Sequence, residues 1–128
     1  MPGDWDRVRE LGNQLPEDAE LPVTDELREL LLRVAPDVAL TAVEASEALS
    51  SPVSAAAFLR EVHRRIRDGS RRLSRALVES YKLKQAGDLA AARQVLSRIA
   101  DVEVVPLYRE QVQIALDHVD APEEETGH

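Results

Sequence analysis

The sequence predicts an all-α protein, a compact bundle of about five to six helices around one long amphipathic helix. Hydrophobic residues make up 44% of the 128 residues and aromatic residues only 3%. The apolar residues are mostly Ala, Leu and Val, a composition that favours helices. The length fits a single domain, which we predict over residues 1–120, followed by an acidic tail, residues 121–128, that we expect to be disordered.

The first segments contain signals for a short helix followed by a loop. Asp4 is a suitable N-cap, and Trp5, Val8 and Leu11 recur at helical spacing behind it. The next stretch, residues 15–22, is polar and lies between two prolines, a pattern typical of a surface loop.

Two further helices are predicted before residue 50. Thr24 is a candidate N-cap for the first of them, and Pro36 ends it. Its predicted core face consists of four apolar residues, Leu27, Leu30, Leu31 and Val34. Thr41 and Glu44 match the capping-box pattern and start a short third helix.

A long fourth helix is predicted over about residues 53–85, with Ser51 as its N-cap and Pro52 at its first helical position. At 100° per residue its apolar positions fall within an arc of about 100° that also contains Gly69. These positions are Phe58, Leu59, Val62, Ile66, Leu73, Ala76 and Leu77. Two separate helices would have no reason to share one phase, so we predict one helix, with a kink at Gly69 left open. Close packing of a neighbouring helix over Gly69 would offset its cost of about 1 kcal/mol.

The C-terminal part predicts an antiparallel hairpin over residues 53–100 and one more helix. Gly87 suits a left-handed position and Asp88 the following N-cap. The second helix of the hairpin has the apolar face Leu89, Ala92, Val95, Leu96 and Ile99. Pro106 either starts the last helix or kinks a continuing one. The last apolar face comprises Leu107, Tyr108, Val112, Ala115, Leu116 and Val119.

Charge is distributed unevenly along the chain. Between Arg60 and Lys84, nine basic residues and three acids give +6, which leaves −14 for the rest of a chain of net charge −8. Five arginines lie in an arc of about 80° opposite the apolar arc. They are Arg60, Arg64, Arg67, Arg71 and Arg75, and we name them the arginine stripe. The stripe is about 22 Å long. Three interpretations stay open: a solvated face paired with acids on neighbouring helices, a surface for a protein partner, and a nucleic-acid site.

No motif for catalysis, cofactor binding or metal binding is present in the sequence. His63, His118 and His128 do not stand at metal-ligand spacing, and there is no cysteine. Phosphate-binding loops and nucleophile motifs are also absent. We therefore predict a protein that is not an enzyme and needs no metal or cofactor. The chain starts without a signal-peptide pattern and has no membrane-length apolar run, so a cytoplasmic location away from membranes is expected.

The leading functional hypothesis is a helical protein-interaction or regulatory module that binds through the arginine stripe. A second hypothesis is an acidic immunity or antitoxin protein that neutralises a toxin, suggested by the −14 charge outside the basic segment. A third is nucleic-acid binding through the stripe, which the net charge of −8 and the lack of interleaved aromatic residues disfavour. The partner, the biological process and the oligomeric state are left open.

Residues 64–111 resemble the DUSAM family, a small domain of unknown function found chiefly in myxobacterial proteins. The resemblance lies in RRIR followed by GSRRL over residues 64–73, AGDL over 86–89 and VVPLYRE over 104–110. Residues 5–6 and 24–38 are also similar. It implies a small helical bacterial domain and no activity or site residues. Residues 87–96 locally resemble a tetratricopeptide hairpin, but one unit is too few for a repeat array.

Overall fold

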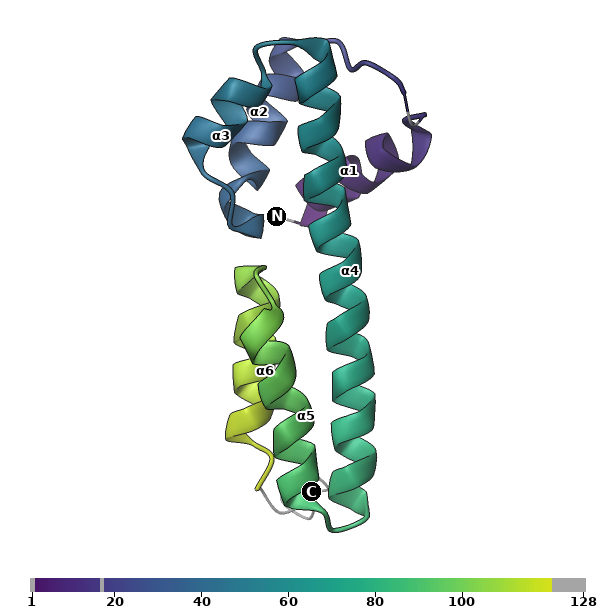
Figure 1. Cartoon of the computed structure of the whole chain (residues 1–128), viewed down its shortest axis with the longest axis vertical. Helices are drawn as coiled ribbons and strands as arrows, with labels where there is room; N and C mark the ends of the chain where they lie inside the picture. Colours follow the sequence, from purple (N-terminus) through teal and green to yellow (C-terminus); the bar gives the residue numbers. More distant parts are fainter. Residues whose placement is uncertain (1, 17, 121–128) are drawn as a thin grey trace. The chain divides into compact units, whose positions relative to one another are not determined.

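In the computed structural model, residues 2–16 and 18–120 are described, and across them the backbone is helical and has no strand (Figure 1). The all-α prediction is therefore confirmed. None of the described helices combines the length and the apolar character needed to cross a bilayer. The acidic tail, residues 121–128, lies outside the described residues, and the expectation of disorder there stays a prediction. The elements are α1 (Pro2–Gln14), α2 (Asp25–Val34), η1 (Pro36–Val38), α3 (Ala42–Ala48), α4 (Pro52–Gln85), α5 (Leu89–Val102) and α6 (Pro106–Asp117).

The contacts divide the chain into two compact units, Met1–Asp68 and Gly69–His128, and each is described by itself. The first unit contains α1, α2, η1, α3 and the beginning of α4. The second contains the rest of α4 with α5 and α6. Helix α4 is thus the one element to which both units contribute. The expected single domain over residues 1–120 stays a prediction.

Helix starts in the first unit follow the predicted caps, with one exception. The Thr24 hydroxyl accepts a hydrogen bond from the Leu27 amide at 3.1 Å, and Thr41 and Glu44 form the complete capping box. Asp4 is not an N-cap, because α1 already begins at Pro2 and Asp4 lies in its first turn. Its carboxylate instead accepts two hydrogen bonds from Arg33 of α2, at 3.1 and 3.2 Å. The acid that sequence assigned to a cap therefore ties α1 to α2.

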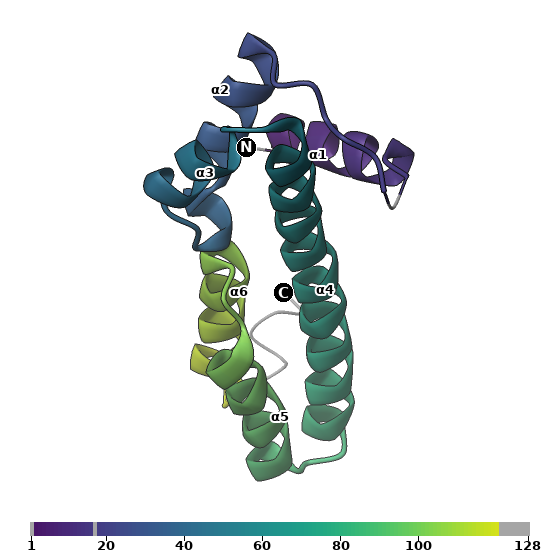
Figure 2. The same ribbon diagram turned by 45° about the horizontal axis from the view of Figure 1, so that its top comes forward.

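Figure 2 shows α1, α2 and α3 beside the beginning of α4. Buried apolar side chains from these helices form the core of the first unit. Trp5 and Val8 of α1 are buried, as predicted, and so are all four residues of the predicted α2 face. From α4 the unit buries Ala55, Ala56, Leu59, Val62 and Ile66. Leu59, Val62 and Ile66 of the predicted apolar arc therefore face this core, whereas Phe58 is only half-buried.

Helix α4 runs without a break through Gly69, as the shared phase of its two halves predicts. The space where a side chain would stand at Gly69 is filled by residues of the second unit. A Cβ there would lie 2.6 Å from Cδ2 of Tyr108 and 2.9 Å from Oε2 of Glu103. The close approach that would offset the cost of a glycine inside a helix is thus present.

The second unit is a three-helix arrangement around a small apolar core. Gly87 takes a left-handed conformation with φ of 83°, and Asp88 caps α5 by accepting from the Ala91 amide at 3.1 Å. The predicted hairpin turn is confirmed. Ala76, Leu96 and Val112, one from each helix, are buried together. Leu77 departs from its predicted place in the core, because 37% of its surface is exposed.

The corner between α5 and α6 is held by a buried carboxylate. Only 1% of Glu103 is exposed, and its Oε2 accepts from the backbone amides of Val104 and Val105 at 3.1 and 3.0 Å. Its Oε1 accepts from Arg72 of α4 at 3.1 Å. A buried charge must be paired and hydrogen-bonded in this way to be tolerated. Pro106 then starts α6 at its first position, which resolves the two alternatives left open by the sequence.

Gly69→Ala tests the close approach over α4. Alanine favours helix by about 1 kcal/mol, but overpacking a filled space costs about 1–3 kcal/mol. We expect a net loss of about 1 kcal/mol in the free energy of unfolding, measured by urea denaturation. The adjacent, exposed Ser70→Ala is the matched control and is expected to lose nothing. A Gly69→Ala protein at least as stable as the Ser70→Ala protein would show that the space over Gly69 is not filled.

Candidate functional site

Arg60, the first residue of the arginine stripe, is engaged with backbone. Its Nη2 donates to the carbonyl oxygen of Pro16 at 2.5 Å and reaches that of Ala19 at 3.5 Å. Both acceptors belong to the loop between α1 and α2 that the two prolines predicted. Arg60 therefore holds this loop against α4.

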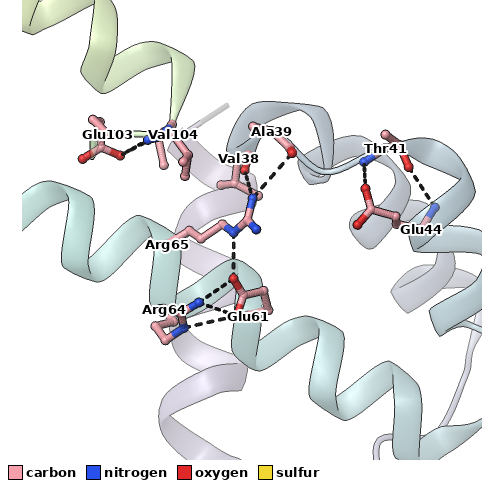
Figure 3. A network of polar contacts seen from close by, with 10 residues as sticks. Val38, Ala39, Thr41, Glu44, Glu61, Arg64, Arg65, Glu103 and Val104 are labelled. Carbon is pink, nitrogen blue, oxygen red and sulfur yellow. Dashed lines mark hydrogen bonds and ion pairs between the residues drawn. The ribbon is translucent and has the colours of Figure 1, made fainter. Parts of the chain in front are cut away.

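The next two arginines of the stripe pair with acids on their own helix. Arg64 donates to both carboxylate oxygens of Glu61, at 2.7 and 2.6 Å, and Arg67 donates to Asp68 at 3.2 Å. Glu61 also accepts from Arg65, whose Nη1 reaches the Val38 carbonyl at 2.7 Å (Figure 3). The interpretation of a solvated face paired with acids thus describes Arg64 and Arg67, although their acids lie on α4 and not on neighbouring helices.

Glu61 shows how these pairs affect ionisation. Burial raises the pKa of its carboxyl group, but the hydrogen bonds and charges of Arg64 and Arg65 together outweigh burial, so the pKa is lowered overall. The lowered pKa keeps the Glu61 carboxylate ionised at neutral pH, where it bridges the guanidinium groups of Arg64 and Arg65. Arg64 and Arg67 remain exposed beside these acids.

The last two arginines of the stripe form no such pair among the described residues, although Asp68 and Glu79 stand near them on α4. Within the described part of the chain, neither Arg71 nor Arg75 has a hydrogen-bond or ion-pair partner, and both are exposed. They belong to the second unit, where Ser74, Val78 and Lys82 share with them an arc of about 100° on α4. We name this set the outer face of α4: Arg71, Ser74, Arg75, Val78 and Lys82. Its apolar member, Val78, is 56% exposed.

Val78 and Lys82 were missed at the level of sequence, although a signal was present. Counted at 100° per residue from Phe58, both fall inside the arc of the five arginines and outside the apolar arc. An apolar residue on the polar side of an amphipathic helix has no place in that helix's own core. Position alone could therefore have marked Val78 as a surface contact residue.

A second feature lies in the first unit, where the end of α1 and the following loop meet α4. They enclose an open hollow of about 430 Å³. Three arginines and one histidine line it, and no acid does. The lining residues are Gly12, Asn13, Leu15, Arg60, His63, Arg64 and Arg67. We name it the basic hollow. The structure thus brings three of the five stripe arginines to one concave surface.

His63 is half-buried against Gly12 at this hollow. A Cβ at Gly12 would lie 2.8 Å from Cγ of the imidazole ring, so only glycine leaves room for it. Burial lowers the pKa of His63, and the charges of Arg67 and Arg9 lower it further, against a smaller opposite effect of Asp68. His63 thus lies at the boundary between the core and the surface of the first unit. No group of three His, Cys, Asp or Glu residues able to hold a metal ion occurs among the residues with described positions.

The sequence matches the model of one known protein family. A family model described as "Protein of unknown function (DUF2379)" matches residues 3–119. The chain belongs to this family. No curated protein and no solved structure matches the chain. Membership of a domain family of unknown function agrees with the expectation from sequence, and the narrower resemblance to DUSAM stays an expectation.

The lowered pKa of His63 makes the stability of this DUF2379 protein depend on pH. As pH falls, His63 of the unfolded chain takes up a proton near its ordinary pKa of about 6.5, whereas His63 of the folded protein does so only at lower pH. Stability is therefore expected to fall as pH is lowered from about 7 towards about 5. His63→Gln should reduce this fall, measured as the change in urea midpoint at each pH. An unchanged pH dependence in the variant would contradict the assigned environment of His63.

Proposed function

We propose that this DUF2379 protein is a cytoplasmic, non-enzymatic interaction module that binds a protein partner through the outer face of α4. The observation that carries the proposal is the difference within the arginine stripe. Arg60, Arg64 and Arg67 have acceptors in the first unit, whereas Arg71 and Arg75 have none among the described residues. Cations without intramolecular partners are available for a partner at no cost in internal contacts.

The chemistry of this face indicates the class of partner. Three cations surround an exposed valine over a length of about 16 Å on one side of a helix. Arginine pairs bidentately with carboxylates, and interfaces favour an apolar centre with a polar rim. An amphipathic helix that carries acids beside an apolar residue would match both features. We therefore infer an acidic amphipathic segment of another protein as the partner.

Arg71→Glu with Arg75→Glu tests this proposal. Partners captured by the wild-type protein are identified by mass spectrometry, purified and measured in a binary binding assay. Reversing two charges should weaken a partner that binds this face by about tenfold or more, and should remove most of the salt dependence of binding. Val78→Asp should weaken the same complex, because it buries a charge at the centre of the interface.

The control reverses two arginine charges that lie outside the outer face of α4. Arg28 and Arg98 are exposed and have no partner among the described residues, so Arg28→Glu with Arg98→Glu matches the change in net charge. Circular dichroism checks that all variants remain helical. Equal weakening by the control pair, or full binding by the Arg71→Glu and Arg75→Glu protein, would remove the outer face of α4 from the proposal.

A further inference from the structure

We propose that the basic hollow of the first unit is a binding site for a small phosphate-bearing molecule, separate from the outer face of α4 and independent of the function proposed for it. The hollow is formed within residues 12–67, and its volume of about 430 Å³ lies in the range of small-molecule sites. Three arginines and a histidine without any acid in the lining are unusual in a chain of net charge −8.

Of the three arginines of the hollow, Arg60 is held in place by loop carbonyls, whereas Arg64 and Arg67 can change their side-chain conformation. Arg60 is held by the loop carbonyls through Nη2 alone, and its other donors have no partner among the described residues. Its guanidinium group is therefore positioned in advance, and donors remain for a ligand. Preorganisation of this kind lowers the entropy lost on binding.

Arg64 and Arg67 are paired only with half-buried acids of the same helix, Glu61 and Asp68. Their side chains are 56% and 48% exposed, and ion pairs of this type contribute little to stability. Phosphate oxygens accept charge-assisted hydrogen bonds from the guanidinium fork as well as carboxylates do. Both side chains can therefore exchange Glu61 and Asp68 for a bound phosphate group, which carries more charge than one carboxylate.

His63 couples such binding to protons. The groups that face it are cationic on both elements, Arg9 from α1 and Arg67 from α4, with Asp68 as the nearby acid. Arg60 and Arg64 line the same hollow. Burial, with the charges of Arg67 and Arg9, lowers the pKa of the imidazole and favours its neutral form, whereas a bound dianion would favour the protonated form. Binding should therefore take up a proton, and affinity should rise as pH falls.

Inorganic pyrophosphate is the probe, and the three histidines of the full chain are the reporters. In a proton NMR titration, pyrophosphate should shift the ring resonance of His63 at saturable concentrations and raise its pKa. His118 and His128 serve as internal references in the same spectra. Sulfate at equal ionic strength controls for salt. Equal shifts of all three resonances, or equal effects of sulfate and pyrophosphate, would show a general effect of ionic strength and overturn the proposal.

Two sets of variants complete the test. Arg64→Gln with Arg67→Gln should weaken pyrophosphate binding by about tenfold or more. Arg28→Gln with Arg98→Gln, which removes two charges outside the hollow, should leave it within about twofold. Pyrophosphate itself titrates, so His63→Gln is compared with the wild type at each pH. The variant should still bind pyrophosphate, but its affinity should lose the additional rise at low pH that protonation of His63 gives the wild type. Undiminished affinity in the Arg64→Gln and Arg67→Gln protein would overturn the assignment.

Discussion

The structure depends on a close contact at Gly69, where helix α4 has no side chain and the ring of Tyr108 and the carboxylate of Glu103 occupy the space. A glycine inside a helix costs about 1 kcal/mol, and close packing is what offsets that cost. Glu103 is fixed there by Arg72 and by the amides of Val104 and Val105, so the corner between α5 and α6 is anchored to α4. The helix can therefore continue through Gly69 and still hold the second unit together.

Continuity of α4 gives its two halves one phase but different surroundings. In the first unit, Arg60 donates to loop carbonyls, and Arg64 and Arg67 pair with acids of α4. Beyond Gly69, Arg71 and Arg75 meet no acceptor among the described residues, and an exposed valine lies between them and Lys82. One periodic pattern in the sequence thus yields two surfaces: a basic hollow in the first unit and an apolar-centred basic face in the second. The two proposals follow from this difference.

Much of the fold could be predicted because its signals are local. The caps at Thr24 and Thr41, the turn at Gly87 and the start of α6 at Pro106 each depend on a few adjacent residues. The helix start at Asp4 was wrong, because that carboxylate pairs with Arg33 of another helix. The burial of Glu103 and the partners of the stripe arginines were out of reach for the same reason. They depend on groups that only the tertiary structure brings together, and periodicity in one helix cannot reveal them.

Residue-resolved amide hydrogen exchange across residues 62–78 tests the continuity of α4 most directly, because each amide there donates to a carbonyl four residues earlier only if the helix is unbroken. Unbroken packing over Gly69 predicts that amides 69–73, whose hydrogen bonds span this position, exchange as slowly as those on either side. Fast exchange confined to amides 69–73 would mean that α4 is two helices joined at Gly69, and would contradict the common origin of the basic hollow and the outer face of α4.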